Sequence, residues 1–297
     1  MTINEVLDLP GVRPVRRTGF GAMQLAGPGV LGPPADPDGA KAVLRRAVEL
    51  GVDHIDTSDF YGPWTVNELI AESLHPYPEG LVLATKIGAY RDRQGAFLPL
   101  GHPDALKAQV HDNLRRLRVD VLDLVYLRHT VDRPGITVQD QLGALVELRE
   151  EGLLRGIGLS NVTLEQFEQA REVTPLAAVQ NAYNLLDRGC ADLLDHAAGL
   201  GVPFAPFFPL GSAFVADSGV RGGELVRSIA RRHEIEPTQV PLAWLLRRSP
   251  AVLLIPGTSS IEHLESNCSA ERVELADSEI AELDALVAEG QAVERAG

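Results

Sequence analysis

Cysteine is scarce in this chain, whose 297 residues include only Cys190 and Cys268. Two cysteines are too few for a disulfide framework and lack the spacing of a metal site, so we expect a reduced chain in the cytoplasm. No apolar run approaches the roughly 20 residues of a membrane-spanning helix. The first residues include acids and lack the apolar core of a secretory signal. We therefore expect no metal and no membrane among the partners.

Positive charge is also in short supply. The net charge of −14 argues against nucleic acid or an anionic membrane as a partner, because both attract basic surfaces. Only three of the 27 basic residues are lysine, namely Lys41, Lys86 and Lys107. Arginine is thus the default cation, and a single arginine says little about function, whereas a lysine says more.

The motifs of several large enzyme classes are missing as well. The chain has no Walker phosphate loop, no His-Glu-x-x-His metal motif and no Gly-x-Ser-x-Gly nucleophile turn. The segments GFGAMQ (19–24) and GIGLSN (156–161) begin like a dinucleotide fingerprint, but neither has the third glycine at the required spacing. We therefore reject a Rossmann-type dinucleotide site.

Short apolar segments with the character of buried strands recur eight times. They lie at 18–25, 52–58, 81–88, 120–128, 154–161, 176–184, 202–211 and 251–260. Segments with helical periodicity separate them, for example around 106–117 and 138–152, and no linker-like stretch marks a domain boundary. This alternation predicts a parallel sheet covered by helices. We expect an α/β fold in which residues 1–297 form a single (β/α)8 barrel, with a doubly wound open sheet as the alternative.

Polar residues end most of these segments, on the side where a barrel collects its active site. They are Asp56, Lys86, Arg128, Ser160 with Asn161, Gln180 with Asn181, and the turn 257–260. A buried polar group without a partner costs about 1–3 kcal/mol. A ring of such groups therefore needs a ligand or one another.

The stretch HIDTSDFYG (54–62) contains Asp56 at the end of one segment and Tyr61 in the loop that follows. Lys86 ends the next segment, LATKIG, and a lysine buried against an acid can be purely structural. In the functional interpretation, Lys86 is held by Asp56 and lowers the pKa of Tyr61 from its usual value of about 10. A phenol of this kind can deliver a proton to an aldehyde oxygen while a hydride arrives at carbon.

The chain resembles the aldo-keto reductases from end to end. The segments that carry the resemblance are HIDTSDFYG, LATKIG, RLRVDVLDLVYLR, RGIGLSN, VQNAYN and LLIPGTSS followed by HLESN. The resemblance implies a (β/α)8 barrel that binds NADPH/NADP+ and reduces aldehydes and ketones as its small-molecule substrates. It also implies a catalytic tetrad of Asp, Tyr, Lys and His, of which the first three match Asp56, Tyr61 and Lys86.

The fourth tetrad position departs from the family pattern. DLVYLR (123–128) puts Arg128 where relatives commonly have histidine, and His129 follows it. Adjacent strand residues point to opposite faces, so we expect Arg128 in the site and His129 directed away, unless a bulge shifts the strand. Arg128 keeps its charge and can polarise a carbonyl, stabilise an oxyanion or hold an anionic substrate group. The alternative is an arginine that merely caps the strand at the surface.

The resemblance also implies cofactor-binding residues. Ser160, Asn161 and Gln180 match positions that hydrogen-bond the nicotinamide carboxamide, and Phe207 matches the aromatic residue that stacks on the ring. Ordinary core packing is the alternative for Phe207.

In the last turn, the implied phosphate-binding residues are Gly257, Thr258, Ser259 and Ser260, at a helix N-terminus. Asn267 matches the position that binds adenine. His263 stands where many relatives have Arg, Lys or Gln, and its charge depends on pH. Histidine is a weaker partner for a 2′-phosphate than Arg or Lys, but the resemblance still implies a preference for NADPH over NADH.

Within the family, GFGAMQLAGPGVLGPPADPDGA, HIDTSDFYGPWTVNELI and VPFAPFFPLG resemble the bacterial pyridoxal reductases. That subgroup also has Leu-Arg where the histidine is expected, which implies reduction of pyridoxal to pyridoxine. Two alternatives stay open: a general aldehyde or keto-sugar reductase, and a nucleotide-sensing subunit like those of potassium channels.

Overall fold

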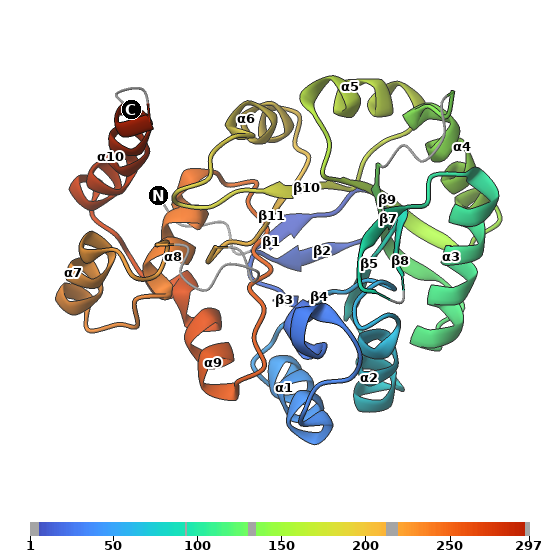
Figure 1. Cartoon of the computed structure of the whole chain (residues 1–297), viewed down its shortest axis with the longest axis horizontal. Helices are drawn as coiled ribbons and strands as arrows, with labels where there is room; N and C mark the ends of the chain where they lie inside the picture. Colours follow the sequence, from blue (N-terminus) through green and yellow to red (C-terminus); the bar gives the residue numbers. More distant parts are fainter. Residues whose placement is uncertain (1–5, 93, 130–134, 212–218, 295–297) are drawn as a thin grey trace.

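The computed structural model describes residues 6–92, 94–129, 135–211 and 219–294, with seven parallel strands at its centre (Figure 1). The strands are β3 (Phe20–Gly21), β4 (His54–Asp56), β5 (Val82–Ile87), β8 (Leu122–Arg128), β9 (Leu154–Ser160), β10 (Ala178–Ala182) and β11 (Phe204–Phe207). Each is hydrogen-bonded to the next one along the chain, so their spatial order follows the sequence. Parallel neighbours require a crossover connection, and helices supply it.

The eighth segment closes the sheet into a ring. It has no regular strand, but Val252 bridges Phe204 of β11 and Leu254 bridges Thr18, both in parallel. Backbone bonds run from Leu253 N to the Phe204 carbonyl (2.9 Å) and from Gly19 N to the Leu254 carbonyl (2.8 Å). The expected (β/α)8 barrel is therefore confirmed. The regular strand expected over 251–260 is thus reduced to isolated bridges at Val252 and Leu254, and Pro256 has no N–H to extend the pairing.

Helices surround the ring. They are α1 (Pro37–Glu49), α2 (Thr65–Leu74), α3 (Pro103–Leu117), α4 (Val138–Glu150), α5 (Leu164–Val173), α6 (Ala191–Gly199), α7 (Glu224–His233), α8 (Gln239–Arg248), α9 (Ile261–Ser269) and α10 (Asp277–Glu294). Local sequence explains several starts. Asp36 caps α1 by accepting from Gly39 N, and Thr137 forms a capping box with Asp140. Among the described residues, no helix is both long and apolar enough to cross a membrane.

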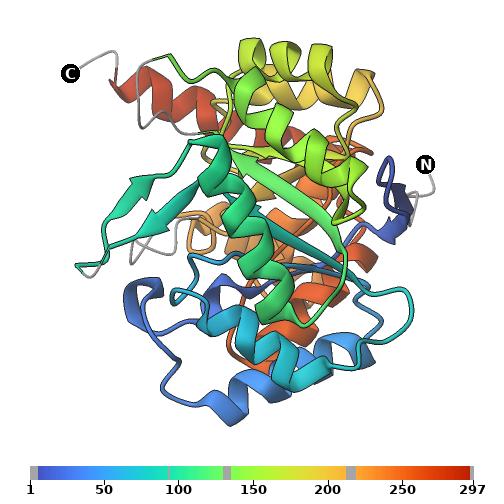
Figure 2. The same ribbon diagram turned by 90° about the vertical axis from the view of Figure 1, so that its right-hand side faces the viewer.

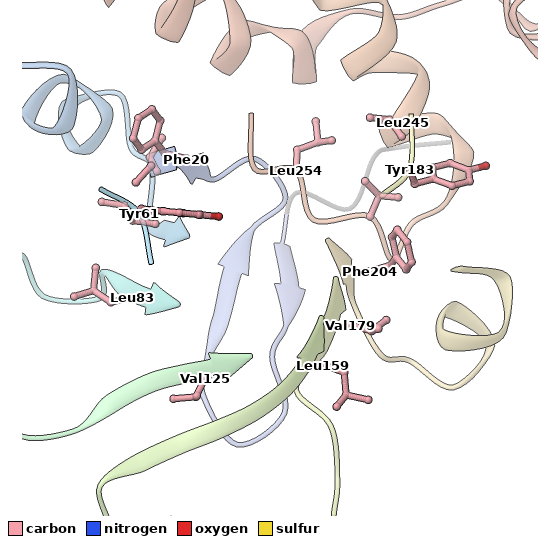
Figure 3. Packing of buried hydrophobic residues seen from close by; sticks show 14 of the residues in the cluster. Phe20, Tyr61, Leu83, Val125, Leu159, Val179, Tyr183, Phe204, Leu245 and Leu254 are labelled. Carbon is pink, nitrogen blue, oxygen red and sulfur yellow. The ribbon is translucent and has the colours of Figure 1, made fainter. Parts of the chain in front are cut away.

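The alternation of β8 separates two hydrophobic layers. Val125 and Leu127 belong to the larger cluster between strands and helices, whereas Leu124 and Tyr126 belong to the smaller cluster inside the ring. Figure 3 shows Val125, Leu159 and Val179 directed away from the centre of the ring. Tyr126 fills space that a neighbouring glycine leaves, because a Cβ on Gly158 would lie 2.6 Å from its ring.

Two hairpins lie at opposite ends of the barrel. The strands β1 (Val6–Asp8) and β2 (Pro14–Arg16) pair antiparallel, and Leu9 and Val15 beside them belong to the cluster inside the ring. They close the end where the parallel strands begin. The hairpin β6 (Ala89–Arg91) and β7 (Phe97–Pro99) follows β5 and projects from the other end (Figure 2). The open mouth is therefore at the carboxyl ends of the strands.

His54 is a titratable group buried in this interior. It is fully buried on β4, and neither ring nitrogen has a hydrogen-bond partner in the described part of the chain. Burial lowers its pKa from 6.5 to about 4, against the opposing attraction of Asp56. His54 is thus neutral in the folded protein at neutral pH.

This depressed pKa makes a prediction about stability. The unfolded chain binds a proton at His54 near pH 6.5, whereas the folded protein does so only near pH 4, so stability is lost as the pH falls through that window. We expect His54→Leu to lose less unfolding free energy than the wild type over this range, measured by urea denaturation at a series of pH values. The exposed His111 provides the control His111→Gln, which should follow the wild type. Equal pH slopes for the wild type and His54→Leu would contradict the prediction.

Candidate active site

A buried ion pair lies at the mouth of the barrel. The Nζ of Lys86 is 2.5 Å from Oδ1 of Asp56, and both side chains are almost completely buried. Lys86 also donates to the Thr57 carbonyl (2.9 Å), and Asp56 Oδ2 accepts from Gln180 Nε2 (2.9 Å). Every oxygen of this carboxylate is therefore bonded, as a buried charge requires. Burial disfavours the ammonium, but Asp56 and Tyr61 outweigh it and raise the pKa of Lys86.

Tyr61 lies directly beside this pair. Its ring centroid is 4.9 Å from Lys86 Nζ, and Figure 3 shows its hydroxyl directed towards the middle of the ring of strands. The pKa of Tyr61 is raised, because burial outweighs the opposing charges of Lys86 and Arg128. The lowered pKa expected from the sequence is thus wrong, although Lys86 does act in the expected direction. The phenol keeps its proton at neutral pH.

The two basic residues that end β8 face different ways. Arg128 lies on the inward side set by Leu124 and Tyr126, and its charge interacts with Tyr61. His129 Nδ1 lies 2.7 Å from Oε1 of Gln141, on the covering helix α4. Burial lowers the pKa of Arg128 from its usual value, but the guanidinium stays charged. An arginine therefore faces the phenol in place of a histidine.

Ser160 and Gln180 present unused polar atoms in the same region. They are paired across β9 and β10, and both are buried. Within the described ranges, neither Ser160 Oγ nor Gln180 Oε1 has a hydrogen-bond partner. Asn161, which follows β9, adopts a left-handed backbone (φ 59°) and donates its N–H to the Gln180 carbonyl. Unbonded buried atoms of this kind call for a polar ligand or water.

A cavity of about 480 Å³ opens beside these groups. The residues expected from the sequence that line it are Asp56, Tyr61, Gln180, Phe207, Gly257, Thr258, Ser259, His263 and Asn267. Lys86 lies behind Asp56, to which it is bonded. The barrel mouth and the last turn therefore line one continuous cavity. Its walls include Asp56 of β4 and Asn267 of α9.

The last turn is built around close backbone contacts. A Cβ on Gly257 would lie 2.5 Å from the Gly21 carbonyl oxygen, so this position tolerates only glycine. Thr258 Oγ1 accepts from Ser260 N (3.0 Å), and Ser260 caps α9 by accepting from His263 N (3.3 Å). These bonds aim the N-terminus of α9, with its partial positive charge, at the cavity edge.

Several lining residues were missed in the sequence. Arg221 and Thr238 line the cavity, as do Met23 and Gln24. Arg221 brings a cation to the wall, but it stands in the irregular stretch before α7 and is one of many arginines. No periodicity or motif distinguishes it. In the described ranges, no cluster of three or more His, Cys, Asp or Glu side chains could hold a metal ion.

Comparisons with known proteins agree with this geometry. A model of the aldo/keto reductase family matches residues 17–288. The chain is similar to the pyridoxine 4-dehydrogenase of Escherichia coli, with 46% identity over 280 residues, or 93% of this chain and 96% of that protein. An uncharacterized oxidoreductase of Schizosaccharomyces pombe is 37% identical over 270 residues, or 91% and 86% of the two chains. The crystal structure of an aldo-keto reductase from Klebsiella pneumoniae in complex with NADPH has a TM-score of 0.81 over 95% of each chain, at 27% identity.

Removing one partner of the buried pair should destabilise the fold. We expect Lys86→Met to lower the unfolding free energy by about 3–5 kcal/mol, because it leaves the Asp56 carboxylate buried without its cation. Urea denaturation followed by circular dichroism measures this change. The control is Lys41→Met, which breaks the partly exposed Lys41–Glu72 pair and should cost no more than about 1 kcal/mol. Equal losses in the two variants would contradict a stabilising role for the buried pair.

Proposed function

Because this chain belongs to the aldo/keto reductase family, we propose that it reduces an aldehyde to an alcohol with NADPH, and that pyridoxal is its substrate. The observation that carries the proposal is the protonated phenol of Tyr61 beside the buried Lys86–Asp56 pair, with Arg128 facing it. The name of the Escherichia coli relative, pyridoxine 4-dehydrogenase, supports the choice of substrate. That choice makes pyridoxine the product.

The nicotinamide end of the cavity fits the cofactor's polar groups. A carboxamide offers both donors and an acceptor, and the unbonded Ser160 Oγ and Gln180 Oε1 can pair with them, together with Asn161. Phe207 lines the cavity, where its ring can stack on the nicotinamide. NADPH supplies the hydride when bound. These residues hold the ring in one orientation and keep water from the reacting carbon.

The other end of the cavity fits phosphate and adenine. Backbone amides from Gly257 to Ser260 lie at the N-terminus of α9, and Arg221 adds a permanent charge. His263 is exposed at the cavity edge and can approach a 2′-phosphate, while the buried Asn267 can pair with adenine. The NADPH-bound Klebsiella structure supports NADPH as the cofactor.

The proton comes from Tyr61. As hydride reaches the carbonyl carbon, the carbonyl oxygen gains negative charge, and the phenol transfers its proton to that oxygen. The ammonium of Lys86 then stabilises the phenolate, which lets the hydroxyl release a proton that burial would otherwise retain. The Arg128 guanidinium is too weak an acid to transfer a proton at neutral pH, so it stabilises the developing oxyanion by its charge and its N–H donors.

Pyridoxal fits Arg128 better than a plain aldehyde does. Its aldehyde stands beside a phenolate, and a guanidinium facing the catalytic phenol can pair with that second oxygen. The net charge of −14 disfavours pyridoxal phosphate as the substrate. Both cysteines are unpaired, which suits a reducing cytoplasm.

The proposal is tested by NADPH consumption with pyridoxal, pyridoxal phosphate, benzaldehyde and a sugar aldehyde side by side. A strong preference for pyridoxal is the expected result. A flat profile would retain the reductase chemistry but reject the substrate. NADPH binding without turnover of any aldehyde would replace the proposal with a nucleotide-sensing role.

Tyr61→Phe removes only the phenolic oxygen. We expect kcat to fall by about 100-fold or more, because general acid catalysis contributes at least that factor. NADPH affinity, measured by fluorescence titration, should change by less than about twofold, since the cofactor's proposed contacts are elsewhere. Wild-type turnover in this variant would remove Tyr61 from the chemistry.

Arg128→His tests the departure from the family pattern. We expect KM for pyridoxal to rise by about tenfold, the loss of one hydrogen bond to a charged group, and KM for benzaldehyde to rise much less. Steady-state kinetics with both aldehydes measures the difference. Arg115→His, at an exposed position on α3, serves as the control and should leave both values unchanged. Equal increases for the two aldehydes would leave Arg128 with a general electrostatic role.

A further inference from the structure

Asp59 is a buried acid that the proposed chemistry does not use. It lies two residues before Tyr61, and its side chain is 4% exposed. One oxygen, Oδ2, accepts from Gln109 Nε2 (2.8 Å), while Oδ1 has no partner in the part of the chain that the structure describes. Burial raises the pKa of Asp59 to about 8, and the nearby Asp112 adds to the effect. The loop that carries Tyr61 therefore contains an acid that is costly to desolvate, and this acid needs a structural or functional explanation.

Gln109, on α3, joins that loop to the end of β5. Its Oε1 accepts from Gly88 N (2.9 Å), and its Nε2 donates both to Asp59 and to the Ala89 carbonyl (2.8 Å). The amide thus uses both of its donor hydrogens and its acceptor. Gly88 and Ala89 follow Lys86 by two and three residues. A single side chain therefore ties the segment that carries Tyr61 to the segment that carries Lys86.

The backbone at Gly88 also lies close to the end of β8. Gly88 has φ +100°, and a Cβ there would lie 2.2 Å from the Arg128 carbonyl oxygen. Ser58, next to Asp59, adds a second link by donating to the Lys86 carbonyl (3.4 Å). Any shift of Gly88 would therefore move the strand ends that hold Lys86 and Arg128 relative to the loop of Tyr61.

We propose that Asp59 and Gln109 are positioning residues that set the separation between the Tyr61 hydroxyl and the Lys86 ammonium. The inference rests on the proposed reductase function. Neither residue lines the cavity, so each acts through Tyr61 and Lys86 and contacts no substrate. A displacement of about 1 Å at reacting groups can cost about 100-fold in rate.

Gln109→Met keeps the length of the side chain and removes all three hydrogen bonds. We expect kcat for pyridoxal to fall by about 10- to 100-fold, with the NADPH dissociation constant within about twofold of wild type, because the proposed cofactor contacts lie on other elements. A larger deuterium isotope effect on kcat with deuterated NADPH should accompany the loss, because the chemical step becomes limiting.

The matched control is Gln239→Met. Gln239 is buried to the same extent as Gln109, 7% exposed in both cases, and makes two hydrogen bonds, to Ser269 and to Glu236 N. It ties α8 to the end of α9 and bonds no residue near Tyr61. The Gln239→Met variant should have a lower free energy of unfolding than the wild type and an unchanged kcat. An equal fall in kcat for the two glutamine variants would reduce the effect to general destabilisation and overturn the inference.

Two variants of Asp59 supply a conservative rescue. Asp59→Asn is neutral and keeps an oxygen that can accept from Gln109, so we expect its kcat within about threefold of wild type. Asp59→Ala removes the acceptor, and we expect its kcat to fall as much as that of Gln109→Met. Wild-type kcat in folded Gln109→Met, or equal kcat in the two Asp59 variants, would overturn the positioning role alone. A wild-type protein that reduces no aldehyde would overturn the proposed function and this inference with it.

Discussion

A buried ammonium cannot stay charged in an apolar barrel without a carboxylate, and the pair formed by Lys86 and Asp56 is the constraint on which the mouth of this barrel depends. Asp56 needs a second donor, which Gln180 supplies from β10, with three strands of the sheet between β10 and β4. Lys86 needs another acceptor, which the Thr57 carbonyl supplies. These bonds fix the ends of β4, β5 and β10 relative to one another. The Lys86 ammonium beside Tyr61 is therefore held in a fixed position.

Closure of the ring makes this arrangement possible. Seven regular strands leave a gap between β11 and β3, and the segment around Val252 and Leu254 fills it by bonding alternately to each side. The hairpin β1–β2 covers the opposite end. Water and ligands therefore have access mainly where the strands end, and the same end carries the ion pair, the phenol and the N-terminus of α9.

The alternation of strand residues explains why Arg128, and not the adjacent His129, lies on the inward side of β8. Leu124 and Tyr126 set the inward side of β8, and Arg128 continues it, whereas His129 turns to Gln141 on α4. A histidine one residue later along a strand is on the wrong face for the site. The charge at this position is therefore permanent, and the proposed mechanism takes its proton from Tyr61.

Side-chain periodicity is a local property, so the eight alternating units and the polar residues at most of their ends could be predicted from the sequence alone. The direction of the Tyr61 pKa shift could be read only from the three-dimensional arrangement, since burial and neighbouring charges oppose each other there. That arrangement alone brought Arg221 to the cavity and joined Asp59 to Gln109, which are 50 residues apart. Such contacts leave no periodic trace, because they depend on how helices pack around the ring and not on the order of residues along any one element.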